Sequence, residues 1–248
     1  MAKVKVIVPV CTSIWNEAIE TLMEEQKEPE TRLNVEDLGC GPDSLEFAYD
    51  RAFSELPTVQ AAEKAEREGY DGVIIYCFAE PGLEAAREAL SIPVFGLCGP
   101  SIHVASLLGT RFTVVLAGSE RMFDSKRRVV RSLVGRYGLA RQCASIRSLR
   151  IPVLELENQG EEKLRKLLAE GRVAVDEDRA DVLVLGCGGI LRIGRDAAQA
   201  VGVPVVIPAI AALKICEATI RMGIAHSKRR FPRPEDKRRI PQACTTLP

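Results

Sequence analysis

One short unit occurs twice in the chain, and it constrains the fold more than any other feature. The first copy runs from Asp71 to Cys77 and the second from Asp181 to Cys187. In each copy an aspartate begins an apolar run, and a cysteine follows the aspartate six residues later, before small or turn-forming residues. Such short apolar runs are typical of strands buried on both faces of a parallel sheet. We therefore expect two matched strands, each with a thiol at its carboxyl end.

The repetition extends beyond these strands. The two cysteines lie 110 residues apart, and a similar interval separates the strand-like runs 4–10 and 112–116. A Pro-Val pair opens a further apolar run in each half, at Pro93 and Pro204. Strand-like and helical segments alternate throughout, which predicts parallel sheets with right-handed crossovers. The expected fold is α/β, with two pseudo-symmetric lobes, each a parallel sheet of about four strands flanked by helices, and an active site in the cleft between them.

Two local features of the first half lead to more specific expectations. The segment 43–68 is predicted to hold two helices, the second beginning at Pro57, because proline is favoured in the first turn of a helix. Thr12 or Ser13 is expected to cap a helix over residues 14–28 through its hydroxyl group.

The composition favours an ordinary globular enzyme or binding protein. Of the 248 residues, 46% are hydrophobic and 27% are charged, and the formal net charge is zero, so the chain as a whole has no character of a nucleic-acid-binding protein. No apolar stretch of about 18 residues is present to span a bilayer, and no signal-peptide-like run precedes the first strand. We expect a cytoplasmic protein with no membrane partner.

The basic tail 227–248 lacks aromatic interleaving, which favours a solvated or partner-packing tail over a nucleic-acid site.

The spacing of the eight cysteines argues against a metal or disulfide framework. The two that are closest in sequence, Cys77 and Cys98, are 21 residues apart, so there is no Cys-x-x-Cys pair. In a cytosolic chain most thiols should be reduced. Taken singly, each cysteine is best interpreted as a small core residue. Cys98 is also kept as a candidate for a residue that lines the cleft.

The matched pair of thiols suggests a particular chemistry. Ligands of open α/β sheets bind beyond the carboxyl ends of the strands, where Cys77 and Cys187 fall. Each also precedes a predicted helix start, whose dipole and free N–H groups favour the thiolate. If the lobes face each other about a pseudo-twofold axis, the two thiols approach a substrate from opposite faces. One thiolate then removes a proton from a carbon next to a carbonyl, and the other thiol returns a proton to the opposite face. Neither role needs a cofactor or a metal.

A carbanion formed in this way needs hydrogen-bond donors for the carbonyl oxygen. The glycine pair Gly188-Gly189 and the turns at Thr12 and Ser119 are candidates, because glycine lets the backbone approach a ligand closely. Pro9 and Phe78 complete the set of candidate substrate-binding residues. Trp15, the single tryptophan, is assigned equally to the core or to the cleft wall.

At several stretches the chain resembles the aspartate/glutamate racemase superfamily and, within it, the hydantoin racemase branch. The matching stretches are 41–46, 77–83, 111–115, 137–139, 151–154, 185–189 and 202–205. The resemblance implies a cofactor-independent two-base racemase with Cys77 and Cys187 as acid and base, and a small-molecule substrate that is a 5-substituted hydantoin or allantoin. It also implies a homo-oligomer, and a last helix that crosses back to the first lobe. Lobe one is then expected at 1–101 plus about 209–248, and lobe two at 102–208.

Some positions depart from the pattern of the branch and leave other functions open. Val8-Pro9-Val10 stands where the branch usually has Asn-Pro-Asn, and the stretch 96–100 lacks the usual glutamate. The alternatives are an amino-acid racemase, or a decarboxylase or isomerase of a small dicarboxylic acid, for which Arg192 and Arg195 would be anion-binding candidates. A non-catalytic small-molecule binding protein and a thiol redox protein are the alternatives from other classes.

Overall fold

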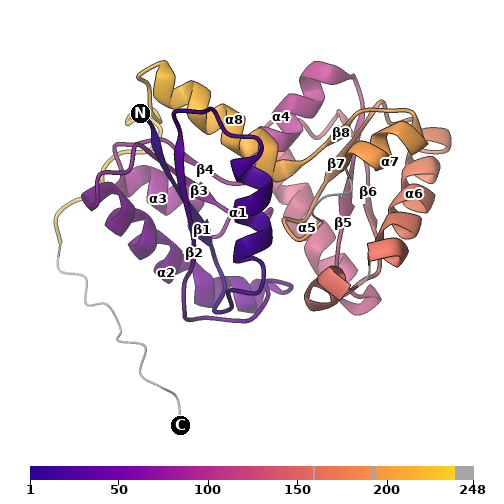
Figure 1. The fold of residues 1–248 in the computed structure, drawn as a ribbon, viewed down its shortest axis with the longest axis horizontal. Helices are drawn as coiled ribbons and strands as arrows, with labels where there is room; N and C mark the ends of the chain where they lie inside the picture. Colours follow the sequence, from indigo (N-terminus) through magenta and orange to yellow (C-terminus); the bar gives the residue numbers. More distant parts are fainter. Residues whose placement is uncertain (159, 191–193, 238–248) are drawn as a thin grey trace, which may run out of the picture.

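The computed structural model describes residues 1–158, 160–190 and 194–237, and it has two parallel four-stranded sheets flanked by helices (Figure 1). The strand order is β2-β1-β3-β4 in one sheet and β6-β5-β7-β8 in the other. The second order is the first with every strand number raised by four, so the two halves of the chain repeat one topology. The expected α/β fold with two similar lobes is confirmed.

The elements alternate along the whole chain. In order they are β1 (Lys3–Val8), α1 (Asn16–Glu24), β2 (Arg32–Asp37), α2 (Ala48–Arg67), β3 (Gly72–Ile75), α3 (Leu83–Ala89), β4 (Val94–Phe95), α4 (Cys98–Leu108), β5 (Phe112–Leu116), α5 (Glu120–Arg136), β6 (Cys143–Ser148), the 3-10 helix η1 (Val153–Asn158), α6 (Gly160–Asp176), β7 (Val182–Leu185), α7 (Gly194–Val201), β8 (Val205–Val206) and α8 (Pro208–Arg221).

The aspartate that begins each repeated unit sets the register of its strand. The Asp71 carboxylate accepts a hydrogen bond of 2.8 Å from the Lys3 backbone N–H, at the start of β1. In the second lobe, Asp181 accepts one of 2.9 Å from the Arg111 N–H, immediately before β5. Each carboxylate therefore joins the start of the cysteine-bearing strand to the start of the central strand beside it.

Apolar residues on the two faces of the first sheet face different helices. Val4, Val6 and Val8 belong to a cluster that includes residues of α1, α4 and α8, and it continues into the second lobe through Phe112. Ile7, on the opposite face of β1, packs in a separate cluster with residues of α2 and α3. The lobes therefore share one continuous apolar core, and α4 and α8 lie between the two sheets (Figure 1).

The helix predicted to begin at Pro57 does not exist as a separate element, and this prediction is wrong. Helix α2 continues through Pro57 without interruption. Proline has no N–H to donate to the Phe53 carbonyl, but one missing hydrogen bond does not end a long helix that is packed on a sheet. The next carbonyl along the helix, that of Ser54, accepts a hydrogen bond of 2.6 Å from the Thr58 hydroxyl.

The predicted cap of the first helix is also wrong. Trp15 occupies the cap position of α1, and no side chain makes the capping hydrogen bond. The Thr12 hydroxyl instead accepts a hydrogen bond of 3.4 Å from the Ile14 N–H, within the preceding turn. The turn after β1 is therefore longer than the residue pattern suggests, and it carries Trp15 toward the centre of the molecule.

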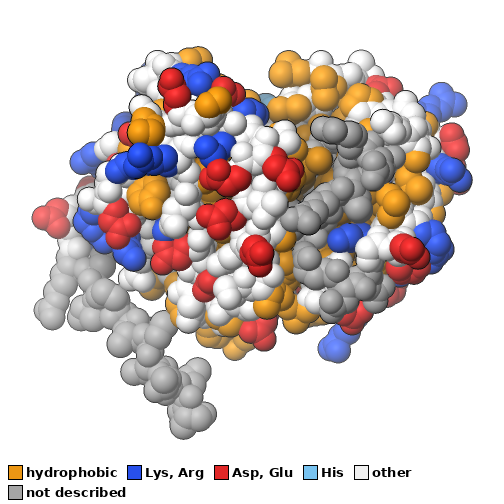
Figure 2. Space-filling view, in the orientation of Figure 1, with side chains coloured by type: hydrophobic (Ala, Val, Ile, Leu, Met, Phe, Trp, Pro, Cys, Tyr) orange, Lys and Arg blue, Asp and Glu red, His pale blue; other side chains and the backbone are white. Residues whose placement is uncertain are grey.

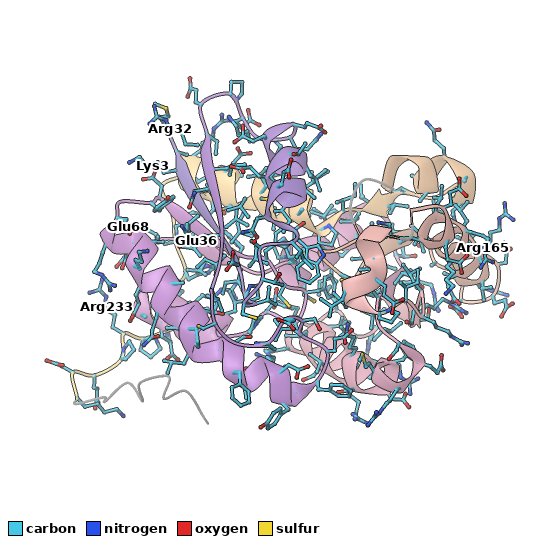
Figure 3. The ribbon with its side chains drawn as sticks, turned by 60° about the horizontal axis from the view of Figure 1, so that its bottom comes forward. Lys3, Arg32, Glu36, Glu68, Arg165 and Arg233 are labelled. Carbon is cyan, nitrogen blue, oxygen red and sulfur yellow. The ribbon has the colours of Figure 1, made fainter. Side chains whose placement is uncertain are left out.

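The first part of the basic tail contacts lobe one through a few side chains, while most of its described residues stay exposed. The Lys228 ammonium donates hydrogen bonds of 2.8 and 3.0 Å to the carbonyls of Arg87 and Glu88 in the last turn of α3, where a cation is favourable. The Phe231 ring faces the Arg87 guanidinium at 5.5 Å. Arg233 donates to Ser91, and Figure 3 shows it on the side of lobe one, far from Arg165 of lobe two.

These contacts support the expected division of the chain. We propose that lobe one comprises residues 1–101 and about 209–248, and lobe two residues 102–208. Of the proposed lobe-one tail, residues 238–248 lie outside the described residues.

Among the described residues, no helix is both long and apolar enough to cross a bilayer. The face drawn in Figure 2 carries acidic and basic side chains on both lobes.

Docking of α8 on lobe one depends on the absence of a side chain at Gly72. A Cβ atom there would lie 2.8 Å from Cys216 Sγ and 2.9 Å from Ile220 Cδ1, both on α8. We predict that Gly72→Val destabilises the protein by about 1–3 kcal/mol, because the valine must displace α8. Urea unfolding measures the change.

The matched control is Gly135→Ala in α5, where a Cβ would meet no atom within 4 Å. Alanine there should stabilise the protein by about 0.5–1 kcal/mol through its higher helix propensity. A Gly72→Val protein with the midpoint of the wild type would show that α8 does not depend on this contact.

Candidate active site

A cavity of about 110 Å³ lies between the lobes, beyond the carboxyl ends of the central strands. Cys77 and Cys187 both line it, so the structure brings the predicted pair together. Cys77 is the second residue after β3, and Cys187 is the second residue after β7. This is the position at which open α/β sheets bind ligands.

The two thiols sit in equivalent turns. The Cys77 carbonyl accepts a hydrogen bond of 3.2 Å from the Glu80 N–H, and the Cys187 carbonyl accepts one of 3.2 Å from the Ile190 N–H. Helices α3 and α7 begin only at Leu83 and Gly194, several residues further on. Backbone N–H groups of the residues just after each cysteine, Ala79 and Gly189 among them, lower the pKa of its thiol.

Burial dominates the acidity of both thiols. Burial, together with a smaller effect of the nearby Cys187, raises the pKa of Cys77 to about 11, against the opposing effect of the Ala79 backbone N–H. Burial likewise raises the pKa of Cys187 above its usual range, and Lys126 and the Gly189 N–H oppose this rise. Because each thiolate disfavours the other, the site suits one thiolate and one thiol at a time.

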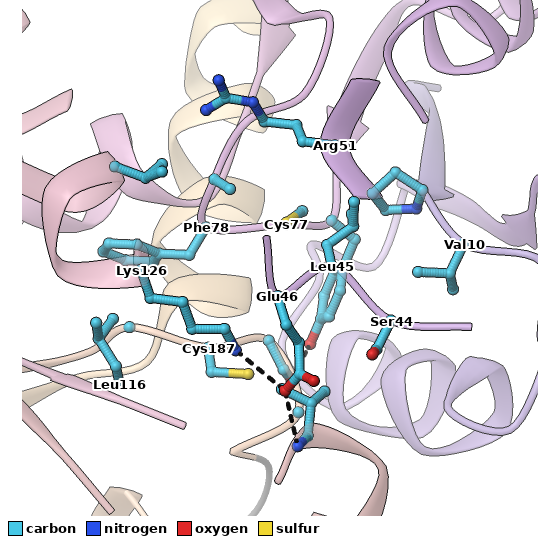
Figure 4. A pocket seen from close by; sticks show the side chains of 18 of the residues that line it. Val10, Ser44, Leu45, Glu46, Arg51, Cys77, Phe78, Leu116, Lys126 and Cys187 are labelled. Atoms are coloured by element: carbon cyan, nitrogen blue, oxygen red, sulfur yellow. Dashed lines mark hydrogen bonds and ion pairs between the residues drawn. The ribbon is translucent and has the colours of Figure 1, made fainter. Parts of the chain in front are cut away.

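An ion pair crosses the cavity between the lobes, and Figure 4 shows it beside Cys187. Lys126 Nζ on α5 lies 3.5 Å from Glu46 Oε1, on the loop before α2, and the two side chains are 15% and 9% exposed. Lys126 also donates a hydrogen bond of 2.8 Å to the Ala117 carbonyl. Glu46 Oε1 accepts a further bond of 3.3 Å from the Val153 N–H of lobe two. The pair therefore places a positive charge near both thiols and joins the lobes.

Lys126 and Glu46 were not predicted as site residues from the sequence. Lys126 lies in a helix rich in arginine, and nothing in its spacing separates it from the solvated residues around it. Glu46 falls within the stretch 41–46 that carries the family resemblance, and this was the one available signal.

Glycines let the two lobes approach each other closely at the site. Tyr76 of lobe one donates a hydrogen bond of 3.2 Å to the Gly188 carbonyl of lobe two. A Cβ on Gly188 would lie 2.6 Å from Tyr76 Cε1. Gly188 therefore has a structural reason to be glycine besides any role of its N–H group.

The remaining candidate residues divide into two groups. Pro9, Phe78 and Gly189 line the cavity together with Gly188. Thr12 and Ser119 are not among the described residues that line it. Ser119 instead precedes the first residue of α5, without a side-chain capping bond.

Other residues considered from the sequence lie away from the cavity or beyond the description. Cys98 is fully buried in the core, where burial raises the pKa of its thiol well above the usual range. Arg192 lies outside the described residues, as does the side chain of Arg195. The cysteines of the described chain are all free, and no group of three His, Cys, Asp or Glu side chains in that part is placed to hold a metal ion.

The walls of the cavity are mainly apolar. Trp15, Leu45, Phe47, Leu116 and Val130 contribute to them. Among the described lining residues, the cations are Lys126 and Arg51, and each has a carboxylate partner, Arg51 through Glu55 at 3.2 Å. The cavity therefore suits a largely neutral molecule with an apolar part.

Comparison with known proteins agrees with this site. The model of the Asp/Glu/Hydantoin racemase family matches residues 4–216. The hydantoin racemase of Pseudomonas sp. (strain NS671) is 32% identical over 236 residues, which cover 95% of this chain and 93% of that protein. The hydantoin racemase of Rhizobium meliloti is 36% identical over 187 residues, which cover 75% of this chain and 76% of the relative.

A solved structure is similar over nearly the whole length. The allantoin racemase from Klebsiella pneumoniae superposes with a TM-score of 0.90 at 30% identity, covering 98% of this chain and 97% of that chain. From the family match, the identity to these relatives and the shared fold, we conclude that the chain belongs to the Asp/Glu/Hydantoin racemase family and is an isomerase of the racemase type.

Proposed function

We propose that the protein is a cofactor-independent racemase that uses Cys77 and Cys187 as its two bases and acts on a 5-substituted hydantoin. The observation that carries this proposal is that two thiols, at equivalent positions of two equivalent lobes, line one cavity. The names of the relatives, hydantoin racemase and allantoin racemase, support this class of substrate.

The proposed reaction moves one proton in and one proton out. One thiolate removes the proton from C5 of the ring, and the C–H electron pair moves into the C5–C4 bond, which places negative charge on the C4 oxygen. The other thiol then donates its proton to the opposite face of C5 and is left as the thiolate. The two ring carbonyls acidify the C5–H bond, and backbone N–H groups at Gly188 and Gly189 are candidates to bind the developing oxyanion.

The apolar walls favour a hydantoin with an alkyl or aryl substituent over allantoin, whose ureido substituent needs polar partners. They also disfavour the dicarboxylate alternative, because both described lining cations are already paired with carboxylates. A homo-oligomeric state and a cytoplasmic location remain proposals that rest on the family resemblance.

The first prediction from the proposed function concerns the two thiols. In deuterated water, the wild type should racemise a 5-substituted hydantoin such as 5-benzylhydantoin and place deuterium at C5. Cys77→Ser and Cys187→Ser should each lower racemisation by about 10²–10⁴-fold, because each removes one proton-transfer group. Polarimetry follows inversion, and NMR follows exchange.

Cys77→Ser and Cys187→Ser also test which thiol acts on which face of C5. Each should still exchange one enantiomer without inverting it, and the two variants should prefer opposite enantiomers. Cys98→Ser is the matched control, since that thiol is buried away from the cavity, and it should leave both rates within a few fold. If Cys77→Ser or Cys187→Ser racemised the substrate at the wild-type rate, the two-thiol assignment would be refuted.

The second prediction concerns the charges beside the thiols. Lys126 lowers the pKa of Cys187 and of Cys77, whereas Glu46 raises the pKa of Cys187. Lys126→Met should therefore shift the rising limb of the pH–rate profile to higher pH and lower the rate at pH 7 on the order of tenfold. Glu46→Gln should shift the limb in the opposite direction.

Two further variants separate charge from structure. Lys126→Arg keeps the charge and should keep the limb near that of the wild type. Lys126→Met combined with Glu46→Gln removes both charges and leaves no buried unpaired ion. Shifts in the same direction for the two single variants would contradict an electrostatic role.

The third prediction concerns the ring substituent. The value of kcat/KM for 5-benzylhydantoin should exceed that for allantoin, and that for the 5-(2-carboxyethyl) analogue, by at least about tenfold, because the described walls offer apolar contacts and their two cations are already paired. Polarimetry on the three pure enantiomers measures this ratio. Equal or reversed values would assign the cavity to a polar substrate.

A further inference from the structure

Trp15 carries a buried hydrogen-bond donor without an acceptor. Its side chain is 5% exposed and lines the cavity, and among the described residues its Nε1 atom has no hydrogen-bond partner. The indole N–H of a buried tryptophan usually finds a partner. Leaving such a donor unpaired costs about 1–3 kcal/mol. Because Trp15 lines the cavity, this donor lies beside the space in which a ligand would bind.

The donor borders the same space as a catalytic thiol. A Cβ atom built on Gly189 would lie 3.0 Å from Leu156 Cδ1, 3.8 Å from Cys187 Sγ and 3.9 Å from Trp15 Nε1. Gly189, which lines the cavity, therefore lies close to both the thiol and the indole N–H. A substrate carbonyl that approaches this glycine comes near both groups.

The position of the indole is determined by its own helix. Trp15 is the cap residue of α1, and its carbonyl accepts a hydrogen bond of 2.9 Å from the Ile19 N–H. Ile19 also lines the cavity. The ring is thus held at the start of a helix that packs in the continuous core, so its N–H presents a fixed donor.

Few other side chains near this part of the cavity offer a donor. The residues at the end of β1 that line the cavity are Val8, Pro9 and Val10, which offer no polar side chain. Lys126 is bonded to the Ala117 carbonyl and paired with Glu46. The indole N–H is therefore a side-chain donor that a substrate can satisfy, in addition to the backbone N–H groups of Gly188 and Gly189.

We infer that the Trp15 Nε1–H donates a hydrogen bond to the C4 carbonyl oxygen of the hydantoin ring, the oxygen next to the inverted carbon. This inference rests on the proposed function. As C5 loses its proton to a thiolate, the electron pair moves onto this oxygen, and the fixed indole donor stabilises the charge that develops there. When the second thiol protonates C5, the electron pair forms the new C5–H bond, the negative charge is left on that thiolate, and the hydrogen bond to the neutral carbonyl weakens again.

The direct test uses the indole itself. The chain has one tryptophan, so a ¹⁵N-labelled protein gives a single indole N–H cross-peak. In the inactive protein with both Cys77→Ser and Cys187→Ser, saturating 5-benzylhydantoin should move this proton downfield. The matched probe is 4-benzylimidazolidin-2-one, which keeps the urea carbonyl and lacks the carbonyl beside the substituted carbon, and it should not produce this shift.

Each outcome decides the inference. An unchanged indole peak, while the backbone peaks of Gly188 and Gly189 show that 5-benzylhydantoin is bound, would overturn it. An equal shift with the imidazolidinone would overturn the assignment to C4 and place the donor on the urea carbonyl.

The kinetic test removes the donor and keeps the ring. Trp15→Phe should lower kcat about 10²–10³-fold with a much smaller change in KM, because the hydrogen bond strengthens in the transition state. Replacing Trp15 by benzothienylalanine, in which sulfur stands for the N–H, keeps the shape of the indole and should have the same effect. Urea unfolding checks that both variants fold.

Failure of this inference is distinguishable from failure of the proposed function. If the wild type shows no C5 exchange with any hydantoin, the proposed function is wrong. If the wild type exchanges and the benzothienylalanine protein keeps the wild-type kcat, the racemase stands and the indole has no role in the reaction.

Discussion

The need to keep two thiols buried in one cavity governs the arrangement of this molecule. Burial raises the pKa of both Cys77 and Cys187, so an apolar cavity alone would leave two unreactive thiols. Groups from both lobes act against this: the Lys126 charge and the N–H groups of the turns after β3 and β7. Enclosing the thiols between the lobes therefore has two opposing effects on their pKa values. It excludes water, which raises them, and it brings in a charge and N–H groups that lower them.

The lobes share a topology, but the turns around their thiols are held differently. The residue three positions after Cys77 is Glu80, which is buried and has a left-handed backbone with φ 53°. Its carboxylate accepts hydrogen bonds of 2.8 Å from the Gly99 N–H and 2.7 Å from the Tyr137 hydroxyl. Ile190, three positions after Cys187, is simply buried among apolar residues. A duplicated scaffold thus supports two chemically distinct surroundings for one pair of thiols.

The fold class and the positions of the two thiols could be predicted from the sequence, because both depend on local pattern. Apolar runs buried on both faces identify β3 and β7, and the cysteine at the end of each follows directly from the chain. The interruption expected at Pro57 failed because tertiary packing outweighs one lost helical hydrogen bond. Lys126, Glu46 and the orphaned Trp15 N–H could not be recognised, because their roles arise from contacts between segments distant in sequence. Composition and spacing do not record those contacts.

A racemase must bind two mirror-image substrates, which differ in the direction of the substituent but share the ring. Equivalent thiols on opposite faces suit the inversion, whereas the ring needs fixed polar partners that do not depend on the face attacked. In this structure α1 and α5 follow the central strands β1 and β5, so they occupy equivalent places in the two lobes. They present different groups to the cavity, a neutral indole N–H at Trp15 and a cation at Lys126. In the proposed mechanism, the duplication therefore supplies two equivalent acid–base groups, and the divergence of two equivalent helices supplies different polar partners for the ring.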